Sequence, residues 1–183
     1  MGERARKAVG RLRALWHLRV LNRHIVTAGV VHMSRGAGIS CRRGLAHMEI
    51  GRDVWIGTGT HIRCHEGSLR IGDRVVFGGS NTVSAYLDVE IGEDCIFADW
   101  IYVTDFDHQY GKLDVRIQDQ GIDTSPVRLG PDCWIGEKAS ILRGSQIGTG
   151  SVIGAQTVVK GDIPPYAVAV GAPAKVIKRR DTR

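Results

Sequence analysis

Apolar residues recur at every sixth position through the second half of the chain, and most of them stand beside a glycine. An α-helix repeats about every 3.6 residues and an ordinary strand alternates with every second residue, so neither explains this spacing. A solenoid with three short faces does explain it, because each six-residue unit then supplies one strand and one corner. The longest series in phase is Leu129, Ile135, Ile141, Ile147, Ile153 and Val159.

Three shorter series nearer the N-terminus have the same period. They are Ile50, Ile56, Ile62; then Ile71, Phe77, Val83; then Ile91, Phe97, Val103. An antiparallel β-sandwich would instead place turn signals about 8–12 residues apart. The pattern therefore predicts an all-β solenoid over residues 32–172, with parallel coils of about 18 residues. We expect these anchors to be buried: Ile56, Ile71, Phe77, Ile91, Phe97, Ile135, Ile141, Ile147 and Ile153.

The period fails once, between Thr104 and Pro126, where we expect a loop that protrudes from the solenoid. Such excursions usually serve function, because the scaffold does not need them. This loop contains His108, with Asp105 and Asp107 close to it. An imidazole can take a proton from a hydroxyl when a carboxylate or a carbonyl orients its other nitrogen. His108 is therefore the catalytic candidate, and we favour Asp105 over Asp107 as its partner.

The formal net charge of +6 comes entirely from the N-terminal segment. Residues 1–23 contain seven basic residues and one acidic residue, whereas residues 24–183 contain 18 of each. Apolar residues at helical spacing predict that residues 1–31 form a basic helical segment. Its expected apolar stripe consists of Val9, Leu12, Leu15 and Trp16.

Three uses fit this helix: contact with an anionic membrane surface, contact with a partner, or packing on the solenoid. We favour packing, because a free helix of this length is marginal in water. Nucleic acid is not an expected partner, because no aromatic platform or second basic stripe accompanies the charge.

The composition is that of a globular protein, with 43% hydrophobic and 24% charged residues. No apolar run approaches the roughly 20 residues that span a bilayer, and the N-terminus carries no export signal. We therefore expect a cytoplasmic protein, with membrane association through residues 1–23 left open. The four cysteines include no CxxC pair, so neither a zinc site nor a redox dithiol is predicted.

Two parts of the chain carry distinctive sequences. The repeats read IGRDVWIG, IGDRVVFG, IGEDCIFA, LGPDCWIG and IGTGSVIG, and residues 150–179 read GSVIGAQTVVKGDIPPYAVAVGAPAKVIKR. These residues resemble the hexapeptide-repeat acyltransferases, and the second stretch is similar to the ending of galactoside, maltose, colanic-acid and antibiotic O-acetyltransferases. The resemblance implies a left-handed parallel β-helix, to which the pattern adds an N-terminal α-helix, one protruding loop and a basic tail over residues 173–183.

The resemblance also implies an activity. Relatives of this kind transfer an acyl group, most often acetyl, from acyl-CoA to a hydroxyl of a sugar, polysaccharide intermediate or glycolipid, and need no metal. His108 matches their catalytic histidine, which stands some two dozen residues before the tryptophan that is Trp134 here. By family position the residues expected to contact acetyl-CoA or another acyl-CoA are Trp134, Gly154, Ala155, Lys160, Lys175 and Lys178.

The sequence gives less information about the acceptor. The polar residues expected to contact it are Ser80, Asn81 and Asp99. Because members of this family are trimers, the resemblance implies a homotrimer. Two alternatives are a non-catalytic β-helix scaffold and a hydratase like the γ-carbonic anhydrases. The hydratase would need zinc-binding histidines in a stretch where this chain has Glu137 and Arg143.

Overall fold

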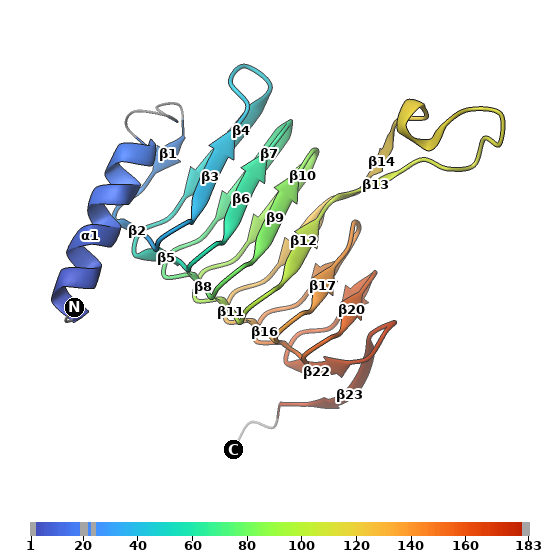
Figure 1. Cartoon of the computed structure of the whole chain (residues 1–183). Helices are drawn as coiled ribbons and strands as arrows, with labels where there is room; N and C mark the ends of the chain where they lie inside the picture. The colour runs from blue at the N-terminus through green and yellow to red at the C-terminus, as the bar shows by residue number, and fades with distance from the viewer. Residues whose placement is uncertain (1–2, 19–21, 23–24, 181–183) are drawn as a thin grey trace.

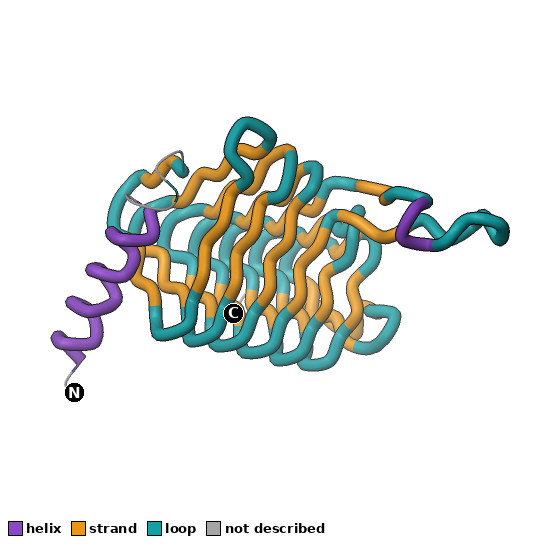
Figure 2. The backbone as a smooth tube through the Cα atoms, turned by 45° about the horizontal axis from the view of Figure 1, so that its top comes forward, coloured by secondary structure: helices purple, strands orange, loops and turns teal. Residues whose placement is uncertain are grey.

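The computed structural model describes residues 3–18, 22 and 25–180, and three parallel sheets form the faces of a solenoid (Figures 1 and 2). Sheet A contains β1 (Val26–Thr27), β4 (Ala46–Ile50), β7 (Gly67–Ile71), β10 (Asp88–Ile91), β15 (Val127–Leu129), β18 (Gln146–Ile147) and β21 (Asp162–Ile163). Sheet B contains β2 (Val31–Met33), β5 (Val54–Ile56), β8 (Val76–Phe77), β11 (Ile96–Phe97), β16 (Trp134–Ile135), β19 (Val152–Ile153), β22 (Ala167–Val170) and the antiparallel β23 (Lys175–Arg179). Sheet C contains β3 (Gly38–Cys41), β6 (His61–Cys64), β9 (Thr82–Ala85), β12 (Tyr102–Thr104), β17 (Ser140–Ile141) and β20 (Val158–Val159).

The core follows the six-residue period. All nine predicted anchors are buried, none more than 3% exposed. They stack in columns, as Ile56, Phe77, Phe97, Ile135 and Ile153 do along sheet B. The rings of Phe77 and Phe97 lie 4.7 Å apart. The predicted parallel β-helix with one helix and one protruding loop is therefore confirmed.

The coils stack so closely that some corners admit no side chain. A Cβ at Gly136 would lie 2.6 Å from the backbone nitrogen of Ala155 in the next coil. No real Cβ sits so near a backbone atom, so the glycines beside the apolar anchors are needed for stacking.

The helix α1 (Glu3–Trp16) lies at the N-terminal end of the solenoid, beside β2 (Figure 1). It packs through small residues, because Ala14 is buried and Gly10 lies against the main chain of Met33. The prediction that α1 packs on the solenoid is confirmed, but within this chain the contact does not use Leu12, Leu15 and Trp16 of the expected stripe. These three side chains are exposed, because small residues allow a closer approach of the helix backbone to the sheet.

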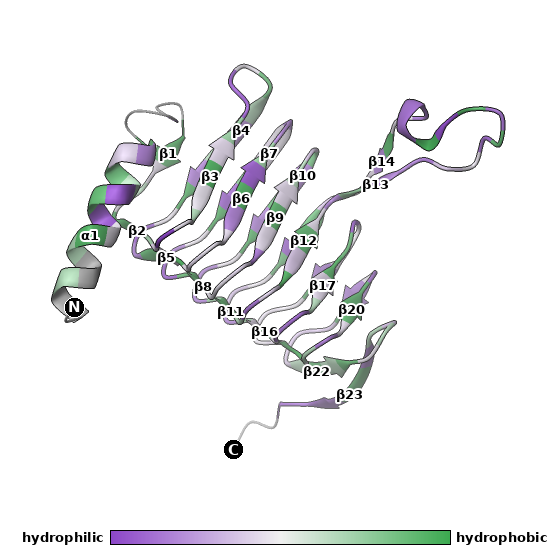
Figure 3. Ribbon diagram, viewed as in Figure 1, coloured by the Kyte–Doolittle hydropathy of each residue, from purple (hydrophilic) through white to green (hydrophobic). Residues whose placement is uncertain are grey.

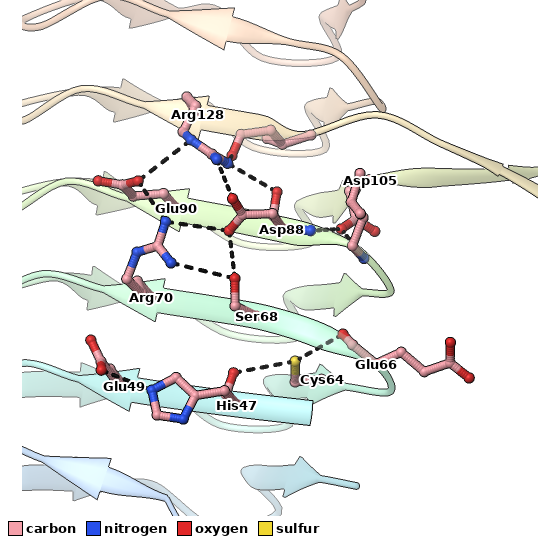
Figure 4. Close-up of polar contacts among 12 residues, drawn as sticks. His47, Glu49, Cys64, Glu66, Ser68, Arg70, Asp88, Glu90, Asp105 and Arg128 are labelled. Carbon is pink, nitrogen blue, oxygen red and sulfur yellow. Dashed lines mark hydrogen bonds and ion pairs between the residues drawn. The ribbon is translucent and has the colours of Figure 1, made fainter. Parts of the chain in front are cut away.

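The outer face of sheet A carries charges whose sign alternates from coil to coil (Figure 4). The register partners are Glu49, Arg70, Glu90 and Arg128. Arg70 donates to Glu90 at 3.0 Å, and Arg128 pairs with both Glu90 and Asp88. Burial opposes ionisation of Asp88, but hydrogen bonds from Ser68 and Arg128 outweigh it and lower the pKa of this carboxyl. Four neighbouring strands, from β4 to β15, thus carry a charge ladder on the solvent side of sheet A.

Candidate active site

The predicted loop is an arm whose base is a β-hairpin. Strand β13 (Phe106–His108) pairs antiparallel with β14 (Ile122–Thr124), and the short helix η2 (Ile117–Asp119) lies beyond them. The arm leaves the solenoid where β12 of sheet C ends and returns before β15 of sheet A, and it projects from the body (Figures 1 and 2). His108 is therefore held at the edge between sheets C and A.

An arginine of the solenoid fastens this hairpin. Asp107 and Asp123 are register partners, so their carboxylates lie on the same side of the hairpin. Arg143, from the corner after β17, donates its Nε to Asp107 at 2.7 Å and lies 4.0 Å from Asp123. Gln109 also donates to Asp123, at 2.7 Å. Without Arg143 the two carboxylates would face each other unneutralised.

A cleft of about 420 Å³ lies at the base of the arm, and His108 is in its wall. Neighbouring residues of a strand point to opposite faces, so His108 points away from the side where Asp107 meets Arg143. Within the described part of the chain, no hydrogen bond to the His108 ring is found, and its side chain is exposed. The other lining residues include Gln109, Lys112, Gln120, Asp123, Arg143 and Lys160.

Asp105 has a different role from the one predicted. Its side chain is 0% exposed, and its two carboxylate oxygens accept the backbone N–H groups of Tyr86, Leu87 and Asp88 at 2.7–2.8 Å (Figure 4). Both carboxylate oxygens are thus occupied by hydrogen bonds from the backbone of the corner between β9 and β10. The expectation that Asp105 orients His108 is corrected: Asp105 ties the start of the arm to the preceding coil.

Aromatic rings form a ladder beneath His108. His65 stacks on Tyr86 with centroids 4.6 Å apart, and Tyr86 meets Phe106 edge to face at 4.5 Å. Phe106 in turn lies edge-on to His108 at 6.3 Å. These rings support the start of the arm next to His108, but they do not line the cleft itself, whose wall is mostly polar.

The residues expected to bind acyl-CoA are divided between two edges of the solenoid. Lys160 shares the cleft with His108. Trp134, whose ring is 54% exposed, lies on sheet B, and Gly154 and Ala155 follow at the edge between sheets B and C. A Cβ at Gly154 would lie 2.7 Å from Cγ1 of Val170 and 3.6 Å from the Ala169 carbonyl oxygen, so a larger residue there would have to displace the Val170 side chain. One chain does not bring the two groups together.

The other predicted residues lie outside the cleft. Lys175 and Lys178 are exposed on β23, at the C-terminal end of sheet B. Ser80 and Asp99 stand at the edge between sheets B and C, where Asp99 accepts the Gly79 N–H at 2.5 Å.

Asn81 is buried, and its amide donates to Ala98 and accepts from Ile101, at 2.9 and 2.7 Å. The expectation that Asn81 contacts the acceptor is corrected, because its side chain links two coils.

Sequence reasoning did not find Arg143, Asp123 or Gln109 as parts of this cleft. Only Arg143 carried a signal in the sequence, because it is a long basic side chain at a corner position that is occupied in the other coils by Cys41, Cys64, Ala85, Asp105 and Gly161. Its partners became visible only through the pairing of β13 with β14.

Replacing Arg143 by Gln should loosen the arm without unfolding the solenoid. The change leaves Asp107 and Asp123 facing each other, and we expect hydrogen exchange in β13 and β14 to rise about tenfold. Arg143→Lys, which keeps the charge, should recover part of the protection. The matched control is Arg116→Gln, because Arg116 pairs with Asp119 at the exposed end of the arm. Unchanged exchange in Arg143→Gln would show that the arm does not need this contact.

The comparisons with known proteins agree with the fold. Residues 126–161 match the family model of the bacterial transferase hexapeptide (six repeats). The chain is 52% identical over 166 residues to “Probable acetyltransferase Rv3034c” of Mycobacterium tuberculosis, a match that covers 91% of this chain and 55% of that relative. It is 32% identical over 120 residues to “Putative lipopolysaccharide biosynthesis O-acetyl transferase WbbJ” of Escherichia coli, covering 62% and 61% of the two chains. The chain thus spans only part of the length of these relatives.

Among solved structures, a mutant of AntD, an N-acyltransferase from Bacillus cereus, superposes with a TM-score of 0.71 at 19% identity. The match covers 90% of this chain and 88% of AntD, which was solved in complex with dTDP-4-amino-4,6-dideoxyglucose and coenzyme A. At this identity the likeness shows the fold alone. The resemblance to hexapeptide-repeat transferases is confirmed.

Proposed function

Because the chain carries the hexapeptide repeat of the bacterial transferases, we propose that it is an acyl-CoA-dependent O-acyltransferase whose acceptor is a sugar-like hydroxyl compound. The observation that carries the proposal is the cleft at the base of the arm: His108, which is exposed and makes no side-chain hydrogen bond among the described residues, and Lys160 both line it. The names of the two curated relatives, both acetyltransferases, support acetyl as the group transferred.

In the proposed reaction His108 acts as the general base. One ring nitrogen takes the proton of the acceptor hydroxyl, and the oxygen attacks the thioester carbonyl of the acyl-CoA. The carbon–sulfur bond then breaks, and the CoA thiol leaves with the proton that His108 had taken. Lys160 supplies positive charge near the donor, and no acyl-enzyme is formed.

We infer that the site is shared between chains of a homotrimer. His108 and Lys160 stand at one edge of sheet C, whereas Trp134, Gly154 and Ala155 stand at or near the other. A threefold arrangement of prisms places one edge of each subunit against a different edge of its neighbour. The neighbour would then complete the donor site and supply a group that hydrogen-bonds to the ring of His108 and orients it.

The experiment measures release of the CoA thiol with a thiol reagent, for acetyl-CoA and longer acyl-CoAs, with a panel of acceptors. The panel contains sugars, nucleotide sugars with hydroxyl or amino groups, and glycolipids. We expect thiol release that depends on both donor and acceptor, with a matching mass increase on the acceptor hydroxyl. Acylation of amino groups alone would contradict O-transfer.

The protein's own thiols will not obscure this measurement. All four cysteines are buried, and burial raises the pKa of Cys64 to about 12. A scaffold without catalysis remains the alternative. It would be indicated by the absence of both acceptor-dependent thiol release and acyl-CoA binding in calorimetry.

A further inference from the structure

The helix α1 meets the solenoid through one narrow face. Gly10 and Ala14 stand four residues apart, and a Cβ at Gly10 would lie 3.4 Å from the carbonyl oxygen of Met33. Ala14 is 2% exposed, and Leu18, four residues further on, packs against the core. Residues at this spacing share one side of a helix, so this side is fully used by the contact with the solenoid.

The large apolar side chains of α1 lie on the other side. Leu12 is 66% exposed, Leu15 45% and Trp16 54%. At about 100° per residue, these three centre roughly opposite the line from Gly10 to Ala14, and Ala8 continues the row toward the N-terminus. We call Leu12, Leu15 and Trp16 the outer stripe. The solenoid of the same chain cannot cover it, because α1 is already docked by its opposite side.

Positive charge borders the outer stripe. Arg11 and Arg13 are exposed and fall on its two flanks by helical position. Neither makes an ion pair with another residue in the described ranges. Residues 1–23 contain seven basic residues and one acidic residue, and this segment holds all of the net charge of the protein. Figure 3 shows the resulting alternation of hydrophobic and hydrophilic positions along α1.

We propose that α1 binds the surface of an anionic phospholipid bilayer. A helix that lies in a membrane interface needs an apolar stripe for the acyl boundary and cations on both flanks for the lipid phosphates, and α1 presents this arrangement outward. No helix among the described residues is long and apolar enough to cross a membrane, so the contact is with the surface.

Charge favours lipid over a second copy of the chain as the occupant. Two α1 helices that met through their outer stripes would bring Arg11 and Arg13 of both chains together and repel each other. A cavity of about 280 Å³ beside the stripe supports lipid as well, because Ala14, Leu18 and Val31 make it apolar and Arg11 lies in its wall. An acyl chain with a phosphate near its end has this chemistry.

The proposal concerns binding and stands whether or not the proposed transferase activity is correct. If the chain is an acyltransferase as proposed, membrane binding through α1 would hold the His108 cleft close to acceptors that are attached to lipid. The arm and α1 lie on different parts of the solenoid (Figure 1), so the surface contact leaves the cleft open.

The test is co-sedimentation of the full chain with vesicles of phosphatidylcholine, with or without phosphatidylglycerol. We expect binding only to the anionic vesicles, weakened at least about tenfold when salt rises from about 0.05 to about 0.5 M. The variant Leu12→Ser/Leu15→Ser/Trp16→Ser and the variant Arg11→Gln/Arg13→Gln should both lose it. Because these side chains are exposed, the melting temperature should not change.

The matched control is Leu113→Ser/Ile117→Ser, which removes two exposed apolar side chains from the part of the arm outside the cleft and should bind vesicles like the unmodified protein. Equal sedimentation of the unmodified chain and the Leu12→Ser/Leu15→Ser/Trp16→Ser variant would overturn the proposal, as would equal binding to neutral and anionic vesicles.

Light scattering measures the size of the assembly. A smaller assembly in the Leu12→Ser/Leu15→Ser/Trp16→Ser variant would overturn the proposal as well, because it would assign the outer stripe to a second copy of the chain. Acyl transfer to a soluble acceptor should be the same in all these variants, so failure of the membrane proposal is separable from failure of the proposed function.

Discussion

Replacing His108 by Ala is expected to lower turnover about 10²- to 10⁴-fold, the range for loss of a general base. The change should leave folding intact, because the ring is exposed and no hydrogen bond holds it in the described structure. Binding of acyl-CoA, measured by calorimetry, should also be unchanged. His47→Ala is the matched control, because His47 is an exposed histidine on sheet A whose ring contacts Glu49. A variant at position 108 that keeps more than about a third of the turnover would remove His108 from the mechanism.

The same variant tests whether the site is shared between subunits. Trp134→Ala should also be poorly active if the tryptophan contacts the donor. When the two variants are co-expressed, about a quarter of the sites in a mixed trimer would combine an intact His108 with an intact Trp134 from another chain. Recovered turnover near that fraction is expected. A mixture no more active than its parts would place both residues in a site built by one chain.

Replacing Asp105 by Ala should be the most destabilising single change near the cleft. It leaves three N–H groups of the corner after β9 without a carboxylate partner, and unsatisfied buried donors each cost about 1–3 kcal/mol. We expect a loss of about 3 kcal/mol or more, which corresponds to a melting temperature lower by roughly 6–12 °C. Calorimetric or dichroism melting curves would measure it.

Two further variants define what this result means. Asp105→Asn keeps one acceptor oxygen, so its melting temperature should lie between those of Asp105→Ala and the unmodified protein. Asp114→Ala changes an exposed residue of the arm and should melt like the unmodified protein. If Asp105→Ala kept its melting temperature and lost turnover as His108→Ala does, Asp105 would be the partner of His108 after all. The structural role assigned to it here would then be wrong.

The sequence predicted the parts of the fold that depend on a local period. An inward anchor such as Ile135 is legible because every coil repeats the same division between inside and outside. The position of His108 was legible as well, because the arm interrupts that period. The packed side of α1 was not, since reasoning from hydrophobicity favours large residues for burial and the contact instead uses Gly10 and Ala14.

The polar residues were harder to predict for a related reason. The partners of Asp105 and Asn81 come from the neighbouring coil, about 20 positions away in sequence, and they are main-chain atoms that carry no residue signature. Closeness in sequence to His108 therefore suggested the wrong partner for the Asp105 carboxylate. Arg143 and Asp107 are separated by the entire arm, so only the folded corner shows their contact.

The charge ladder on sheet A bears on how a chain of near-identical repeats finds its correct order. The inward anchors of the coils are all apolar and similar in kind, so the core by itself distinguishes one coil from another only weakly. If β7 paired directly with β15, Arg70 would face Arg128, and if β4 paired with β10, Glu49 would face Glu90. Like charges directly opposite each other destabilise a sheet. Among the four coils from β4 to β15, the alternation therefore opposes pairings that skip one coil and favours the native order of neighbours.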